Sequence, residues 1–288
     1  MKPAILRVFG VLGFPVAHSK SPAMHNAAFR ALGLDAVYVP FAVEPGALGD
    51  ALAGVRALGL GGVSLTLPHK EAALSLMDEV ESEARAVGAI NTVLHTRRGL
   101  TGANTDAKGL ASALVEAGIV LRGCDVVVLG AGGAARAAVM GLRGAGARRI
   151  CVAARRVRQA ERLIATLPAS DTEHSASSLG PELAGSFAGA DVLVQASSAT
   201  LGDTPEARAF ASALPIDRLP QHCVVHDLAY SPLVTSVLER AREHGLQTVD
   251  GLTTLLHQGA LAFERWTGRD APLAVMRAAL YAPEAVEP

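Results

Sequence analysis

The chain has 288 residues, 50% of them hydrophobic, a length that allows either one large domain or two. Its net charge of -1 gives no overall attraction to nucleic acid or to an anionic membrane, so small molecules are the expected partners. No apolar run approaches the roughly 18 residues that a membrane span needs, and the N-terminus lacks a signal-peptide pattern. Three scattered cysteines without a CxxC pair favour a reducing, cytoplasmic location. No metal site is expected, because no second ligand cluster accompanies His222, Cys223 and His226.

The first predicted strand covers residues 8–12, and a helix is expected from about Pro22 to Leu32. Ser21 precedes a proline and fits the N-cap position of that helix. Capping would not explain Ser19, and two hydroxyl groups beside a helix start also suit a polyol or carboxylate ligand. Capping and ligand binding both stay open for these serines.

Two further strands are expected at 37–41 and 62–67, with a helix at 45–58 between them, and this alternation predicts a parallel sheet. A helix expected from Pro68 toward residue 77 would place Lys70 in its first turn. The positive end of the helix dipole disfavours a charged lysine there, which makes Lys70 a candidate proton donor or acceptor. An ordinary exposed lysine is the alternative.

A hairpin is predicted from strands at 89–94 and 100–102, and a helix from about 107 to 117 follows it. Asp106 is a natural N-cap for that helix, and capping alone would account for it. We expect a domain boundary within this helix.

The apolar run Val126–Leu129 is typical of a strand buried on both faces, and an Ala-rich predicted helix follows it. Gly130, Gly132 and Ala135 occupy the small-residue positions of the G-x-G-x-x-G/A turn, where a pyrophosphate approaches the backbone at a helix start. A second strand at 149–154 completes a strand-helix-strand unit. A dinucleotide site is therefore favoured over a purely structural turn.

Arginines follow the second strand of this unit, where NAD sites usually carry an acid. Arg155, Arg156 and Arg158 can each form forked hydrogen bonds with a phosphate. NADP is therefore favoured over NAD, with a solvated loop before the helix expected at 160–167 as the alternative.

The C-terminal part is expected to extend the same sheet and to end in a long helix. Gln258 lies among apolar residues of that helix, where a hydrogen-bonded amide explains it as well as a ligand contact does. The expected segments are strands at 191–196, 224–228 and 247–250, and helices at 234–244 and from Gly251 to Trp266.

Six ordered motifs cover essentially the whole chain: Ser19–Pro22, Thr66–Lys70, Gly88–Thr92, Asn104–Asp106, Gly130–Ala134, and Asp250–Leu252 with Gln258. Together they resemble the motifs of the shikimate dehydrogenase family. This resemblance implies an α/β fold with a substrate-binding domain at 1–106, completed by C-terminal helices at 251–288, and an inserted Rossmann-type NADP-binding domain at 107–250. It implies reversible, NADP-dependent reduction of 3-dehydroshikimate to shikimate by a monomer or homodimer.

The resemblance also implies roles for individual residues. Catalysis falls on Lys70 and Asp106, and which of them transfers the proton stays open. No metal is implied. Substrate binding falls on Ser19, Ser21, Thr66, Asn91, Asp106, Tyr230 and Gln258. Cofactor binding falls on Gly130, Ala131, Gly132, Gly133, Ala134, Arg155, Arg156, Arg158, Ser197 and Gly251.

Three segments depart from the family pattern. Ala154-Arg155-Arg156 replaces the usual Asn-Arg-Thr, Ser64 replaces an Asn, and Gln195-Ala196-Ser197 replaces Asn-Ala-Thr. These changes leave room for a family member that acts on quinate or an amino-substituted analogue. A rival of another class is a non-catalytic NADPH-binding sensor, which would not need both Lys70 and Asp106.

Overall fold

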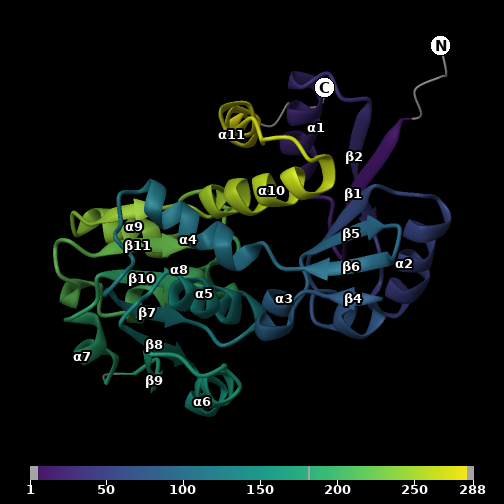
Figure 1. Ribbon diagram of the computed structural model, residues 1–288. Helices are drawn as coiled ribbons and strands as arrows, with labels where there is room; N and C mark the ends of the chain where they lie inside the picture. The colour runs from purple at the N-terminus through teal and green to yellow at the C-terminus, as the bar shows by residue number, and fades with distance from the viewer. Residues whose placement is uncertain (1–5, 181, 284–288) are drawn as a thin grey trace. The chain divides into compact units, whose positions relative to one another are not determined.

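The computed structural model describes residues 6–180 and 182–283, which divide into two compact units. The described part of unit 1 is 6–105 with 255–283, and unit 2 is 106–254. Each unit is built on a six-stranded sheet covered by helices (Figure 1). No helix among the described residues is both long and apolar enough to cross a membrane.

The sheet of unit 1 is mixed, in the order β2-β1-β3-β5-β6-β4. The first three of these strands are parallel, whereas β5 runs antiparallel to β3 and forms a hairpin with β6. The start of β5 therefore lies at the same edge as the ends of β1 and β3. The strands are β1 (Arg7–Gly13), β2 (Ala36–Ala42), β3 (Gly62–Leu65), β4 (Glu79–Val80), β5 (Thr92–Thr96) and β6 (Gly99–Ala103).

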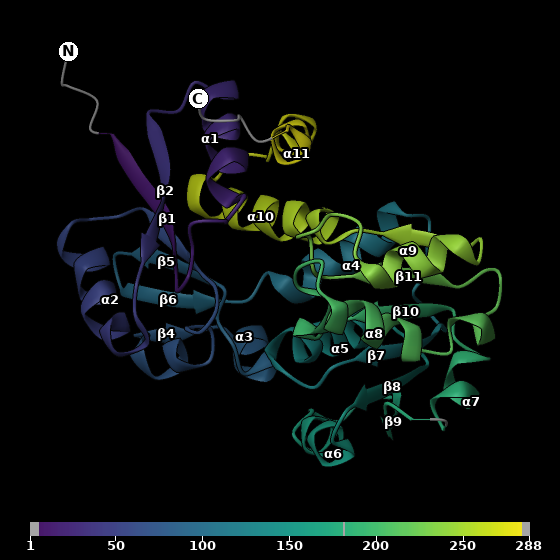
Figure 2. The same cartoon turned by 180° about the vertical axis from the view of Figure 1, so that it is seen from behind.

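Alternating side chains of β1 supply the two cores of unit 1. Leu12 packs into an aliphatic cluster with α2 (Leu48–Ala57), whereas the Phe9 ring lies 5.3 Å from the Phe29 ring and 5.5 Å from that of Trp266. The aromatic residues join the sheet to α1 (Ser21–Ala31) and to α10 (Gly251–Thr267). Helix α11 (Leu273–Tyr281) lies beside α1 in both views (Figures 1 and 2).

Unit 2 has an all-parallel sheet in the order β12-β11-β10-β7-β8-β9, the doubly wound arrangement of dinucleotide-binding folds. Val126 and Val128 pack against α4, α5 and α6, whereas Val127 and Leu129 pack against α7, α8 and α9. The strands are β7 (Asp125–Leu129), β8 (Arg149–Ala154), β9 (Glu173–Ser178), β10 (Val192–Gln195), β11 (Val224–Asp227) and β12 (Gln247–Val249). The helices are α4 (Asp106–Glu116), α5 (Gly133–Gly144), α6 (Val157–Ala165), α7 (Leu183–Phe187), α8 (Pro205–Ala213) and α9 (Ser236–Glu243).

The structure corrects several predicted elements. The α-helix expected from Pro68 is absent: β3 ends at Leu65, residues 68–71 form a turn, and Ala72–Leu76 is a 3-10 helix. The helix expected at 45–58 divides into a 3-10 turn, Pro45–Ala47, and α2. Strands β4 and β9 and the short helices α3 (Ser82–Val87) and α7 were not predicted.

Candidate active site

The polar residues of unit 1 that were predicted to bind substrate lie along one edge of its sheet. Thr66 follows β3, and its N–H donates to the Leu12 carbonyl of β1 at 3.0 Å. Asn91 precedes β5, and its carbonyl accepts from the Leu65 N–H at 2.8 Å. The loop carrying Ser19 follows β1 at the same edge. The topology therefore brings together residues from three separate motifs.

Asn91 is 2% exposed and holds several parts of this edge together. Its Oδ1 accepts from the Thr105 N–H at 2.8 Å and from the Thr92 hydroxyl at 3.0 Å. Its Nδ2 donates to Thr105 Oγ1 at 2.9 Å and to Gln258 Oε1 at 3.1 Å. This last contact joins two predicted substrate residues that are 167 positions apart in the chain.

The predicted capping role of Ser21 is wrong. Helix α1 begins at Ser21 itself, Lys20 holds the N-cap position, and the Ser21 side chain is buried. The Ser21 N–H instead donates to Ser19 Oγ at 3.4 Å, so Ser19 accepts the hydrogen bond from the helix start. The helix can start one residue early because Pro22 is still within the first turn, where a backbone N–H has no helical partner.

Lys70 is not in the first turn of an α-helix, which removes the dipole argument for its role. It lies in the 68–71 turn, partly buried, and its carbonyl accepts from the Ile90 N–H at 2.8 Å, directly beside Asn91. His69 anchors the turn: it is 1% exposed, and its Nε2 lies 2.7 Å from the Val43 carbonyl oxygen. Sequence reasoning left His69 unassigned, because a single histidine carries no pattern.

Asp106 and Tyr230 belong to unit 2. Helix α4 begins at Asp106, one residue before the predicted start, so this acid lies in the first helical turn rather than ahead of it. Its neighbour in the chain is Thr105, which binds Asn91 through both its backbone and its hydroxyl. Tyr230 follows β11 and is partly buried, and that burial raises the pKa of its phenol.

A hollow at the carboxyl edge of the unit 2 sheet collects predicted coenzyme residues. Gly130, Ala131, Arg155 and Ser197 all line it. Gly130 has a φ of +119°, and a Cβ there would lie 3.0 Å from the Ala196 carbonyl oxygen, so only glycine fits without strain. Beyond it, Gly132 is the N-cap of α5, and Gly133 and Ala134 form the first turn, where free N–H groups favour an anion.

Arg155 also lines a second hollow, together with Arg156, Arg158, Arg162 and Ser178. Within 6–180 and 182–283, these four arginines have no ion pair or side-chain hydrogen bond, so their guanidinium groups are available to an anion. Arg162 was not predicted as a coenzyme residue. The sequence feature that could have identified Arg162 is its position one helical turn after Arg158.

Gly251 has a packing explanation of its own. It is the first residue of α10, and a Cβ there would lie 2.5 Å from the Leu228 carbonyl oxygen and 2.6 Å from that of Ala229. Close approach of the helix to the end of β11 therefore requires glycine whether or not a coenzyme binds.

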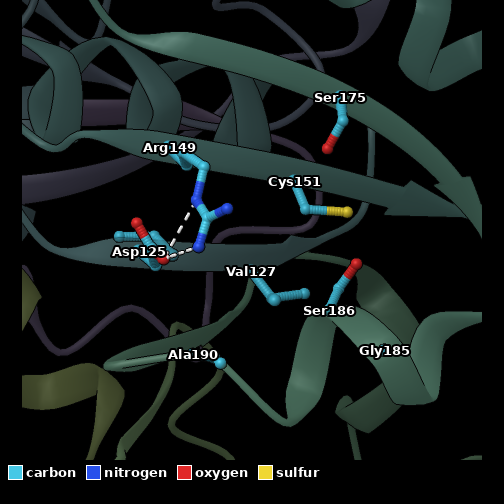
Figure 3. A pocket seen from close by; sticks show the side chains of 10 residues that line it. Asp125, Val127, Arg149, Cys151, Ser175, Gly185, Ser186 and Ala190 are labelled. Atoms are coloured by element: carbon cyan, nitrogen blue, oxygen red, sulfur yellow. Dashed lines mark hydrogen bonds and ion pairs between the residues drawn. The ribbon is translucent and has the colours of Figure 1, made fainter.

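A third hollow lies at the amino edge of the same sheet, and no predicted site residue lines it. Figure 3 shows the Arg149 guanidinium reaching Asp125, with the Cys151 thiol and Ser186 hydroxyl pointing into the space. Burial acts to raise the pKa of Asp125, but hydrogen bonds from Arg149 and Arg148 outweigh it and lower that pKa. Asp125 is thus a partnered carboxylate remote from the coenzyme edge.

Three family models match this sequence. The shikimate dehydrogenase substrate binding domain matches residues 11–93, and shikimate / quinate 5-dehydrogenase matches 110–255. The shikimate 5'-dehydrogenase C-terminal domain matches 251–281.

Individual relatives agree with these matches. A shikimate dehydrogenase (NADP(+)) of Symbiobacterium thermophilum is 46% identical, over 96% of this chain and 94% of the relative. A shikimate 5-dehydrogenase from Thermus thermophilus, solved with NADP(H) and shikimate, is 39% identical with a TM-score of 0.83, covering 95% of this chain and 98% of that one. A quinate dehydrogenase from Corynebacterium glutamicum, solved with NAD, is 30% identical with a TM-score of 0.84, covering 95% of this chain and 98% of that one. The chain therefore belongs to the shikimate dehydrogenase family.

Proposed function

We propose that this protein catalyses the reversible, NADP-dependent reduction of 3-dehydroshikimate to shikimate. The observation that carries the proposal is the edge of the unit 1 sheet where Asn91 binds Gln258 beside the Lys70 turn. Amide, hydroxyl and ammonium groups gathered there suit a small polyol that carries a carboxylate. The activity in the names of the relatives agrees with this chemistry.

The residues of unit 2 fit NADP. The Gly130 turn leaves room for a pyrophosphate at the start of α5, and unpaired arginines follow β8 where an NAD site would carry an acid. We assign the 2'-phosphate to Arg155, which lines both hollows, with Arg156 and Arg158 adding charge. When bound, the nicotinamide supplies or accepts the hydride.

We propose a division of roles among the predicted residues. Lys70 and Asp106 carry out proton transfer: the carbonyl oxygen gains a proton during reduction, and the hydroxyl loses it during oxidation. Thr66, Asn91 and Gln258 orient the ring substituents together with Ser19, Ser21 and Tyr230. Gly130 to Ala134, Ser197 and Gly251 form the coenzyme side. The substrate-binding domain corresponds to 1–106 with 251–288, and the NADP-binding domain to 107–250.

Quinate is the second candidate substrate, because Ser64 stands in β3 in place of the family's usual asparagine. Serine has a shorter side chain and one fewer hydrogen-bonding group than an asparagine amide, so a contact that the usual asparagine would make with the substrate differs here. A relative of the same fold is named quinate dehydrogenase, which supports this second candidate.

Steady-state oxidation of shikimate and of quinate, each with NADP and with NAD, tests the proposal. We expect kcat/KM to be highest for shikimate with NADP. A higher kcat/KM for quinate would transfer the assignment to that substrate. Coenzyme binding without turnover of either compound would indicate a sensor.

We also infer a cytoplasmic location, supported by free thiols at Cys124, Cys151 and Cys223, and an assembly no larger than a homodimer. Sedimentation velocity of the purified protein distinguishes monomer from dimer.

A further inference from the structure

A chain of buried polar side chains connects two loops at the carboxyl edge of the unit 2 sheet. Gln195 ends β10 and Asp227 ends β11, and these strands are neighbours in the sheet. Gln195, Thr200, Asp227 and Thr235 are each 0% exposed. A fully buried carboxylate and amide are costly unless hydrogen bonds satisfy them, so their arrangement is specific.

Gln195 holds the loop that contains Ser197. Its Oε1 accepts from the Ser197 N–H at 3.0 Å and from the Ser197 hydroxyl at 2.9 Å. Its Nε2 donates to the Ser197 carbonyl at 3.0 Å and to the Thr200 hydroxyl at 2.9 Å. This loop also forms the wall against which the Gly130 turn packs.

Asp227 holds the loop that contains Tyr230. Its Oδ1 accepts from the Ala229 N–H at 2.9 Å, directly before Tyr230. Its Oδ2 accepts from the Thr235 hydroxyl at 2.6 Å, and Thr235 is the N-cap of α9. Both ends of the Tyr230 loop are therefore tied to one carboxylate.

Thr200 joins the two halves. Its hydroxyl accepts from Gln195 and donates to Asp227 Oδ1 at 3.2 Å. A backbone bond from the Gly202 N–H to the Ser231 carbonyl, at 2.9 Å, runs between the same loops. Displacement of either loop thus breaks hydrogen bonds that hold the other.

We propose that Asp227 is a positioning residue that couples the Ser197 loop, residues 196–202, to the Tyr230 loop, residues 228–235. This coupling fixes the position of the Ser197 loop relative to Tyr230 within unit 2. The catalytic consequence rests on the proposed function, whereas the mechanical coupling does not. Burial raises the pKa of Asp227 to about 6, against the three donated hydrogen bonds, which agrees with a group held for its geometry.

Hydrogen exchange of the full-length protein tests the coupling without substrate or coenzyme. Thr200→Val removes the linking hydroxyl while keeping the side-chain shape, and Thr235→Val removes the hydroxyl at the far end. We expect Thr200→Val to speed amide exchange in 228–235, and Thr235→Val to speed it in 196–202, by about 10-fold, the change for one lost hydrogen bond. Asp125→Asn, at the opposite edge of the sheet, should leave both loops unchanged.

A double-mutant cycle in kcat/KM for shikimate tests the catalytic consequence. If Asp227 acts through the position of Tyr230, Tyr230→Phe should lower kcat/KM by a smaller factor in the Asp227→Asn background than in the parent. KM should change together with kcat, since both walls move. An amide exchange rate that rises only in the loop carrying the substitution would overturn the coupling. An equal loss of kcat/KM on Tyr230→Phe in both backgrounds would overturn it as well. Should Thr200→Val fail to fold, Thr200→Ala, which removes the same linking hydroxyl, replaces it. A parent that does not oxidise shikimate refutes the proposed function, while the exchange result still decides the coupling.

Discussion

Coenzyme choice should depend on Arg155, whose removal we expect to weaken NADP and spare NAD. The side chain is exposed and has no partner among the described residues, so Arg155→Ala should cost little folding free energy. Its proposed contact is a charge-assisted hydrogen bond to the 2'-phosphate, worth roughly 1.5–3 kcal/mol. That energy corresponds to a KM for NADP about 10- to 100-fold higher.

NAD has no phosphate at this position, so its KM should change less than about twofold. Arg122→Ala is the matched control, because it removes the same charge from an exposed residue ahead of β7, at the amino edge of the same sheet. Added salt should weaken NADP binding more than NAD binding in the parent. An equal rise in KM for both coenzymes would refute the reasoning and make Arg155 a support of the loop.

Four further changes test other parts of the site. Lys70→Ala should lower kcat by about 100-fold or more with a smaller change in KM, and a kcat within about threefold of the parent would remove Lys70 from proton transfer. Gly130→Ala should weaken coenzyme binding and lower Tm, because a Cβ at φ +119° would lie 3.0 Å from the Ala196 carbonyl oxygen. An unchanged coenzyme Kd in titration calorimetry would contradict this. Asn91→Ala should raise KM for shikimate and cost about 2–4 kcal/mol in denaturant unfolding, whereas Ser21→Ala should have little effect on stability, since Ser21 caps no helix. Burial raises the pKa of Asp227 from 3.8 to about 6, so the folded state holds a proton that the unfolded state releases, and this contribution to stability is lost as pH rises through these values; the stability of the parent relative to Asp227→Asn should fall by roughly 2.5 kcal/mol from about pH 4 to pH 7 in urea melts.

The sequence predicted best the elements in which local pattern and tertiary packing agree. The run Val126–Leu129 is buried on both faces as expected, and residues 149–154 form a strand over that whole range. The mixed α/β fold with a Rossmann-type part is confirmed, and the apolar strands and their intervening helices had indicated it. Where hydrophobic periodicity is strong, tertiary contacts seldom change the secondary structure that the local pattern indicates.

Prediction failed where backbone pairing or a single contact decides the structure. Strand β9 consists of Glu173-His-Ser-Ala-Ser-Ser178 and has no apolar run, since it forms the edge of the sheet through backbone hydrogen bonds. The Lys70 turn is held by His69 on the Val43 carbonyl, a contact 26 residues away that local propensity does not encode. The Gln195 to Asp227 network was missed for the same reason, because its members are separated in sequence and meet only through strand pairing.

The central claim is that this chain reduces 3-dehydroshikimate with NADPH through Lys70 and its neighbours. Purified protein should consume NADPH when given 3-dehydroshikimate and form one shikimate for each NADPH oxidised, as measured by coenzyme absorbance and mass spectrometry of the product. The same amount of Lys70→Ala protein, shown to be folded, should form shikimate at about a hundredth of that rate or less. Folded parent protein that binds NADPH but forms no shikimate would contradict the account.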